Sequence, residues 1–211
     1  INRGTVDRSP EGFASRAIET LKLTGASGIK IAPFDGYRTS ECSPSEANAL
    51  ITIGIERAAA VRQAIGSEAL LLIDCHSRFS SLQAINLIQE LAKLKVFWVE
   101  DPCDMANLGV SQLHRMRGCA NDLGLRVAGG EKILDFNELM RFLAREGHDV
   151  ILPDLRFTGL MQGLAMMRLA GSQGVELSLH NPVGPVLNAI AVHAASALPN
   201  FMILERQLGE T

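Results

Sequence analysis

Several common signals are missing from this 211-residue sequence, and each absence excludes a class of protein. No run of Lys or Arg occurs and the formal net charge is -3, which argues against nucleic acid or an anionic membrane as a partner. No apolar stretch reaches the roughly 18 residues that a membrane-spanning helix needs. No secretory signal peptide is visible, so we expect a cytoplasmic protein, although the sequence begins at Ile1 and not at Met.

The cysteines also lack a functional pattern. None of the four forms a C-x-x-C pair, and no Cys/His spacing typical of zinc sites occurs. We therefore expect reduced thiols, as is usual in cytoplasmic proteins. The four are Cys42, Cys75, Cys103 and Cys119.

What the sequence does contain is an alternation of short apolar runs and longer amphipathic ones. The short runs are rich in Val, Ile, Leu or Phe, as strands buried on both faces should be. We expect strands at 28–32, 70–74, 96–100, 126–130, 150–153, 176–180 and 201–205. We expect helices at 10–23, 45–65, 81–94, 112–123, 137–146, 160–171 and 186–198, with Ser9, Ser43 and Asp135 placed to begin three of them.

This alternation predicts an α/β fold with right-handed crossovers and a parallel sheet. A (β/α)8 barrel has eight strands and typically about 250 residues. Seven strands with a helix ahead of the first are therefore explained most simply as residues 1–211 of a TIM-like barrel domain, with strand one upstream of Ile1. An open doubly wound sheet is the alternative, but no Gly-rich dinucleotide loop follows any strand.

Polar side chains recur where the expected strands end, about one strand–helix unit apart. In barrel enzymes, active sites are built at this end of the strands. A single Asp or Glu at such a position is often only a helix cap or a solvated loop residue. The full series is Lys30, Asp74, Glu100, Glu131, Asp154, His180 and Glu205.

Three successive carboxylates in this series predict a metal site. If Asp74, Glu100 and Glu131 point into one mouth, they repel one another unless a cation lies between them. Oxygen ligands from separate strands suit Mg²⁺. Asp101 competes with Glu100, but neighbours on a strand face opposite ways, and Glu100 continues the apolar strand.

Two histidines could move protons at the same mouth. His76 lies two residues after Asp74, so on a continuing strand both would share a face. A lone His180 would usually be structural. Asp154, at the end of the preceding strand, favours instead an Asp–His pair in which the carboxylate fixes the tautomer of a general base.

At this point the sequence resembles the enolase superfamily, in its mandelate racemase and muconate lactonizing enzyme-like branch. The matching motifs occur in the family's order along nearly the whole chain. They are Ile-Lys-Ile-Ala (29–32), Ile-Asp-Cys-His (73–76), Trp-Val-Glu-Asp-Pro (98–102), Gly-Gly-Glu (129–131), Leu-Pro-Asp (152–154), Leu-His-Asn-Pro (179–182) and Leu-Glu (204–205).

The resemblance implies a chemistry for these residues. Mg²⁺ would be held by Asp74, Glu100 and Glu131, and the proton α to a substrate carboxylate would be removed by a Lys or His. Asp154 and His180 match the family's Asp–His dyad. Glu205 matches the residue expected to hydrogen-bond the enediolate oxygen.

Two departures from the family pattern shape the functional hypothesis. Many members carry Lys-x-Lys on the strand of Lys30, and here Ala32 replaces the second Lys, so one base is absent. Lys30 then has either an electrostatic or a structural role. The family's N-terminal capping domain has no counterpart in residues 1–211, so the chain is expected to be part of a longer protein or inactive alone.

The Asp-x-His of Asp74 and His76 resembles galactonate dehydratase-like acid sugar dehydratases, in which the His protonates the departing 3-hydroxyl. The segments 181–185 and 198–201 are similar to that subgroup too. The leading hypothesis is a Mg²⁺-dependent sugar acid dehydratase, a lyase, acting on a small carboxylate and forming a homo-oligomer. A racemase or epimerase with Lys30 as second base is the alternative, and a non-catalytic barrel or inactive fragment is another.

Overall fold

The computed structural model describes residues 7–38, 40–182 and 184–207. By their internal contacts they form two compact units, which divide between Arg126 and Val127. The strands are β1 (Gly28–Ile31), β2 (Leu70–Asp74), β3 (Trp98–Glu100), β4 (Arg126–Gly129), β5 (Val150–Ile151), β6 (Glu176–Leu179) and β7 (Phe201–Leu204). The helices are α1 (Pro10–Thr24), α2 (Pro44–Ile65), α3 (Ser81–Ala92), the 3-10 turn η2 (Met105–Asn107), α4 (Val110–Asp122), α5 (Phe136–Ala144), α6 (Leu155–Thr158), α7 (Leu160–Ser172) and α8 (Pro185–Ser196).

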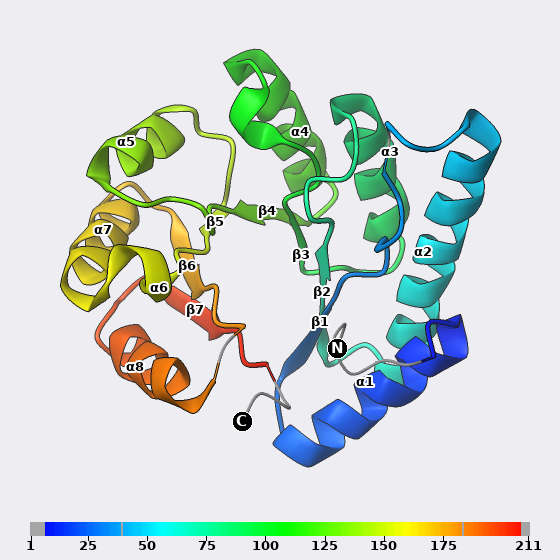
Figure 1. Ribbon diagram of the computed structural model, residues 1–211, viewed down its shortest axis with the longest axis horizontal. Helices are drawn as coiled ribbons and strands as arrows, with labels where there is room; N and C mark the ends of the chain where they lie inside the picture. Colours follow the sequence, from blue (N-terminus) through cyan, green and yellow to red (C-terminus); the bar gives the residue numbers. More distant parts are fainter. Residues whose placement is uncertain (1–6, 39, 183, 208–211) are drawn as a thin grey trace. The chain divides into compact units, whose positions relative to one another are not determined.

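Every strand pairing that the structure describes is parallel. In the first unit β1 pairs with β2 and β2 with β3, and in the second β4 pairs with β5, β5 with β6 and β6 with β7. Within each unit the strand order follows the sequence, β1-β2-β3 in the first and β4-β5-β6-β7 in the second (Figure 1). A doubly wound sheet would reverse its strand order partway, whereas sequential parallel strands joined by helices are the topology of a barrel. The predicted (β/α) fold class is therefore confirmed.

The start signals in the sequence act as predicted. Ser43 and Glu46 form a reciprocal capping box at the beginning of α2, and the Ser9 and Asp135 side chains accept backbone N–H groups of α1 and α5. Helix α5 ends at Ala144, and Glu146 takes a left-handed conformation (φ 47°) just beyond it.

Each unit has an apolar core of its own. The buried side chains of the first unit include Phe13 of α1, Val61 of α2, Leu71 and Ile73 of β2, and Trp98 of β3. The second unit buries a cluster beneath its helices, which comprises Ile133, Leu139, Ile151, Leu155, Met166, Met167, Ala170, Leu177, Leu179, Ala191, Ala194, Ala195 and Leu198. These cores hold the strands of each unit in register, so that the residues at the strand ends have fixed positions.

Two short elements were not predicted, and every strand except β2 is one or two residues shorter than expected. Helix α6 and the turn η2 span four and three residues, too few to show a helical period in the sequence. Strand β3 begins at Trp98 and not at Val96, and Lys95 takes a left-handed conformation (φ 51°) three residues before it. All four cysteines are free, as expected.

Candidate active site

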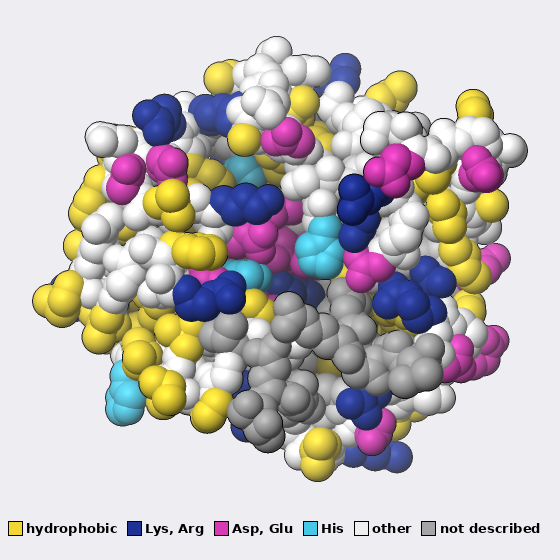
Figure 2. Space-filling model, viewed as in Figure 1, with side chains coloured by type: hydrophobic (Ala, Val, Ile, Leu, Met, Phe, Trp, Pro, Cys, Tyr) yellow, Lys and Arg dark blue, Asp and Glu magenta, His cyan; other side chains and the backbone are white. Residues whose placement is uncertain are grey.

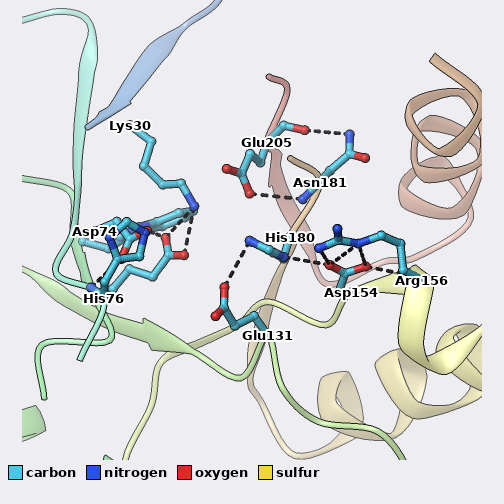
Figure 3. A network of polar contacts seen from close by, with 11 residues as sticks. Lys30, Asp74, His76, Glu131, Asp154, Arg156, His180, Asn181 and Glu205 are labelled. Atoms are coloured by element: carbon cyan, nitrogen blue, oxygen red, sulfur yellow. Dashed lines mark hydrogen bonds and ion pairs between the residues drawn. The ribbon is translucent and has the colours of Figure 1, made fainter. Parts of the chain in front are cut away.

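In the first unit, a buried ion pair joins the ends of β1 and β3. Lys30 Nζ lies 2.9 Å from both carboxylate oxygens of Glu100, whose residue exposure is only 1% (Figure 3). Trp98 Nε1 donates a further hydrogen bond of 3.3 Å to Glu100 Oε2. A carboxylate buried this deeply needs such compensation, because leaving water costs several kcal/mol per ion. Lys30 therefore has at least this charge-balancing role.

Asp74 lies directly opposite Glu100 in the register of β2 and β3. Burial alone would raise the pKa of the Asp74 carboxyl, but hydrogen bonds from His76 and the charge of Lys30 outweigh it and lower that pKa. Two carboxylates thus stand side by side at the carboxyl ends of neighbouring strands. As a donor set, they fit a divalent cation that prefers oxygen ligands.

The third predicted metal ligand, Glu131, belongs to the second unit, after β4. Among the residues that the structure describes, no three His, Cys, Asp or Glu side chains are grouped as a metal centre would require. Lys30 and His76 balance the charges of Glu100 and Asp74. The assignment of all three carboxylates to one metal site stays a prediction.

His76 does not lie on a strand, contrary to the prediction, although it does contact Asp74. Strand β2 ends at Asp74, and His76 (φ 50°) and Ser77 (φ 57°) both take left-handed conformations. Backbone strain of this kind costs of order 1–3 kcal/mol per residue and is often found at functional sites. The turn brings His76 Nε2 to 2.8 Å from Asp74 Oδ2, and the His76 backbone N–H donates to Asp74 Oδ1.

The other ring nitrogen of His76 meets a residue that the sequence analysis did not select. His76 Nδ1 lies 3.2 Å from Oδ1 of Asp35, which follows β1. The hydrogen bonds to Asp35 and then to Asp74 outweigh burial and raise the pKa of His76 to about 10. Both contacts favour the protonated form of the His76 imidazole.

In the second unit, His180 and Asp154 form the predicted pair. His180 Nδ1 lies 2.8 Å from Oδ2 of Asp154, a carboxylate with no exposed side-chain surface (Figure 3). His180 Nε2 lies 3.0 Å from Oε2 of Glu131. The predicted hydrogen-bond contact between Asp154 and His180 is thus present. The second ring nitrogen of His180 faces Glu131, one of the predicted metal ligands.

Asp154 has a further cationic partner in Arg156, whose role the sequence analysis did not foresee. Arg156 Nε donates to Asp154 Oδ2 at 2.9 Å, and the Arg156 backbone N–H donates to Oδ1 at 2.8 Å. Asp154 is therefore both the cap of α6 and the partner of His180. Burial opposes ionisation, but the hydrogen bonds from His180 and Arg156 hold the pKa of Asp154 well below its usual range.

Glu205 follows β7 and is held by Asn181. The Asn181 backbone N–H donates to Glu205 Oε2 at 3.1 Å, and its side-chain amide donates to the Glu205 carbonyl at 2.9 Å. The same amide donates to Asn188 Oδ1 of α8 at 3.0 Å. Asn181 opens the 181–185 motif, in which Val183 lies outside the described residues.

The surface is mixed in charge. On the face that Figure 2 draws, Lys and Arg side chains are interspersed with Asp and Glu, consistent with the net charge of -3. No helix in the described part of the chain is long and apolar enough to cross a membrane.

Curated relatives are sugar acid dehydratases. The chain is 29% identical over 199 residues to a D-gluconate dehydratase of Thermoproteus tenax, covering 94% of this chain and 38% of that protein. It is 26% identical over 205 residues to a D-xylonate dehydratase of Haloferax volcanii (94% and 48%), and 24% identical over 191 residues to a D-galactonate dehydratase of Ralstonia pickettii (89% and 49%). The chain thus spans less than half the length of each of these relatives.

Solved structures share the fold. An enolase superfamily member from Salmonella Typhimurium superposes with a TM-score of 0.80 at 24% identity, covering 95% of this chain and 51% of that one. A mandelate racemase/muconate lactonizing enzyme from Jannaschia sp. CCS1 gives 0.78 at 25% identity, covering 99% and 52%. The family model described as enolase C-terminal domain-like matches residues 13–211. The chain therefore belongs to the enolase C-terminal domain-like family.

Proposed function

We propose that this protein is a Mg²⁺-dependent dehydratase of a sugar acid. The observation that carries the proposal is the geometry of His180, whose Nδ1 is held by the buried Asp154 while Nε2 faces Glu131. An imidazole oriented by a carboxylate is the arrangement of a general base. Relatives named for the dehydration of gluconate, xylonate and galactonate supply the substrate class.

In this proposal Asp74, Glu100 and Glu131 hold the cation. When bound, Mg²⁺ supplies positive charge that stabilises an anionic carboxylate substrate and makes its α proton more acidic. The remaining work belongs to the chain's own side chains. Glu205, with Oε2 fixed by Asn181, hydrogen-bonds the substrate carboxylate as negative charge builds there. Lys30 keeps positive charge beside Glu100.

The proton transfers are divided between the two histidines. His180 Nε2 removes the proton from C2, and the electron pair of that bond moves onto the substrate carboxylate to give an enediolate. The electron pair then returns to form the C2–C3 double bond as the C3–O bond breaks. His76 gives its proton to the departing 3-hydroxyl, which leaves as water. The enol product then tautomerises to a 2-keto-3-deoxy acid. The contacts of His76 with the carboxylates of Asp35 and Asp74 support this division, because they favour its protonated form.

A racemase or epimerase is the second candidate. That chemistry needs a base on each face of the α carbon, and Lys30 is the side chain that would supply the second one. The contacts do not favour it, because Lys30 is engaged with Glu100. A non-catalytic protein of this family remains a third outcome of the test.

The test uses the intact protein with Mg²⁺ and a set of sugar acids that includes D-gluconate, D-galactonate and D-xylonate. Formation of a 2-keto-3-deoxy acid and exchange of the α proton in heavy water are followed in parallel. We expect His180→Asn to lower both dehydration and exchange of the α proton by roughly 10²–10⁴-fold. We expect His76→Asn to lower dehydration by a similar factor while it keeps exchange. The exposed His193 of α8 supplies the control, since His193→Asn should match the parent.

Each other outcome identifies a different function. An epimerised sugar acid without keto product would support the racemase or epimerase candidate. Neither product nor exchange with any sugar acid would contradict catalysis by this protein. Exchange that survives in His180→Asn would move the base to another residue, with Lys30 the first to test.

A further inference from the structure

The two histidines have the same pattern of partners. In His180, Nδ1 faces Asp154 at 2.8 Å and Nε2 faces the proposed metal ligand Glu131 at 3.0 Å. In His76, Nδ1 faces Asp35 at 3.2 Å and Nε2 faces the proposed metal ligand Asp74 at 2.8 Å. Asp35 thus occupies, relative to its imidazole, the place that Asp154 occupies relative to His180.

We propose that Asp35 is a positioning residue for His76, so that the site contains a second Asp–His pair. Asp35 accepts the Nδ1–H of His76 and thereby keeps Nε2 as the nitrogen that is turned toward Asp74. This inference rests on the proposed dehydratase function, in which His76 delivers a proton from Nε2. Carboxylates that orient a histidine in this way generally matter about 10- to 100-fold in activity.

The turn that carries His76 explains why an external partner is needed. His76 and Ser77 are consecutive left-handed residues beyond the end of β2, and the His76 side chain is 41% exposed. An exposed imidazole can rotate about its side-chain bonds on a picosecond to nanosecond timescale unless it is held. Contacts at both ring nitrogens fix its direction, and Asp35 supplies the one that does not involve Asp74.

Asp35 is itself fixed, as a positioning residue must be. Arg78 NH2 donates to Asp35 Oδ1 at 2.8 Å, and NH1 of the same guanidinium donates to the Tyr37 carbonyl at 3.1 Å. Arg8 adds an ion pair at 3.8 Å. Burial raises the pKa of Asp35, but the contacts with His76 and then with Arg78 outweigh burial and lower that pKa. The carboxylate therefore stays ionised at neutral pH.

An aromatic cluster locks the loop of Asp35 onto the segment that follows β2. The rings of Phe34 and Phe79 meet edge to face at 5.1 Å, and Tyr37 lies 5.0 Å from Phe79. Gln83 Nε2 donates to the Tyr37 hydroxyl at 2.8 Å. Gly54 in α2 leaves room for Phe34, since a Cβ there would lie 2.2 Å from that ring. The segments that carry Asp35 and His76 are therefore packed against each other and hold these two residues in place.

The first test follows the imidazole itself and needs no substrate. The intact protein is labelled with ¹⁵N-histidine, and the His76 ring signals are assigned by their loss in His76→Asn. We expect the parent to show one ordered ring with a hydrogen-bonded Nδ1–H. In Asp35→Ala these signals should shift and broaden, whereas Asp35→Asn, which keeps an acceptor oxygen, should largely restore them. Glu41→Gln changes an exposed acid of the same loop and should have no effect.

The second test measures turnover with Mg²⁺ and whichever sugar acid the parent dehydrates. Asp35→Ala should lower kcat for dehydration roughly 10- to 100-fold with little change in KM. Exchange of the α proton should persist, because the proposed base is His180. Asp35→Asn should lose less activity than Asp35→Ala, and thermal melting should show that both variants are folded.

The outcomes separate this inference from the proposed function. Unchanged His76 signals or an unchanged kcat in Asp35→Ala would overturn the positioning role. Equal losses of dehydration, exchange and substrate affinity would overturn it as well, because they would show a purely structural residue. If the parent dehydrates no sugar acid, the proposed function fails, and the ring signals alone decide whether Asp35 orients His76.

Discussion

Lys30 Nζ lies 2.9 Å from each carboxylate oxygen of Glu100, and the Lys30 side chain is only 17% exposed. The same ammonium lowers the pKa of Asp74 through its charge. One cation from β1 therefore balances the carboxylates at the ends of β2 and β3. If that cation is removed, a nearly buried carboxylate loses its closest positive charge.

Lys30→Met should consequently destabilise the metal-free protein. Removing one partner of a buried ion pair costs roughly 3–5 kcal/mol, because the other charge stays buried and unpaired. Urea unfolding at neutral pH in the presence of a chelator measures the change. Lys93→Met is the matched control, since Lys93 pairs with Glu90 on the exposed face of α3 and surface pairs contribute about 0–1 kcal/mol. Equal effects of the two substitutions would contradict the buried-pair interpretation.

Magnesium should bind the protein and raise its melting temperature, since a ligand that binds only the folded state stabilises it. Asp74→Asn, Glu100→Gln and Glu131→Gln should each weaken Mg²⁺ binding by more than about tenfold, because even partners of metal ligands matter about 10- to 100-fold. Calorimetric titration of the parent and the three variants gives the affinities. The exposed Glu90→Gln should bind like the parent. A ligand variant that keeps the parent's affinity would remove that residue from the site.

Acid should weaken the fold partly through Asp154. Its folded pKa is held below the ordinary value of 3.8 by His180 and Arg156 despite burial, so the stabilisation is present above that value. It is lost as the pH falls and the carboxylate is protonated. Unfolding free energies measured from about pH 6 down to pH 2 should fall more steeply for the parent than for Asp154→Asn. Parallel curves would show that Asp154 does not contribute.

Asn181→Ala should lower the unfolding free energy by about 1–3 kcal/mol, because it leaves the Glu205 carbonyl and Asn188 without the buried amide that bonds both. Asn188→Ala breaks only one of these contacts and should cost less. Chemical denaturation of both variants provides the comparison. A larger loss in Asn188→Ala than in Asn181→Ala would show that the amide is not the centre of this network.

The strand ends could be predicted from the sequence because burial on both faces leaves a clear signal there. The run Leu-Leu-Leu-Ile-Asp ends where β2 ends, and the polar residue that closes it, Asp74, stands opposite Glu100 in the sheet. The pair of Asp154 and His180 could also be predicted, since parallel strands place residues at equivalent positions side by side. Hydrophobic periodicity and sheet topology are enough to predict both features from the sequence.

The surroundings of His76 could not be predicted in this way. Its left-handed turn breaks the period of two that placed it beside Asp74, and no apolar pattern marks such a turn. Asp35 lies 41 residues away in an irregular loop, and its contact depends on how Phe34, Tyr37 and Phe79 pack. The position of Arg156 beside Asp154 depends on the four-residue helix α6, which is too short to show a helical period in the sequence.

The aromatic cluster that joins the segments after β1 and β2 also limits how this protein can acquire new substrates. An insertion in either segment would displace the other through Phe79, and with it the imidazole of His76. These two loops cannot vary independently without moving His76, the proposed proton donor. Changes of specificity by loop variation are therefore expected to be found, or engineered most safely, in the loops after the later strands.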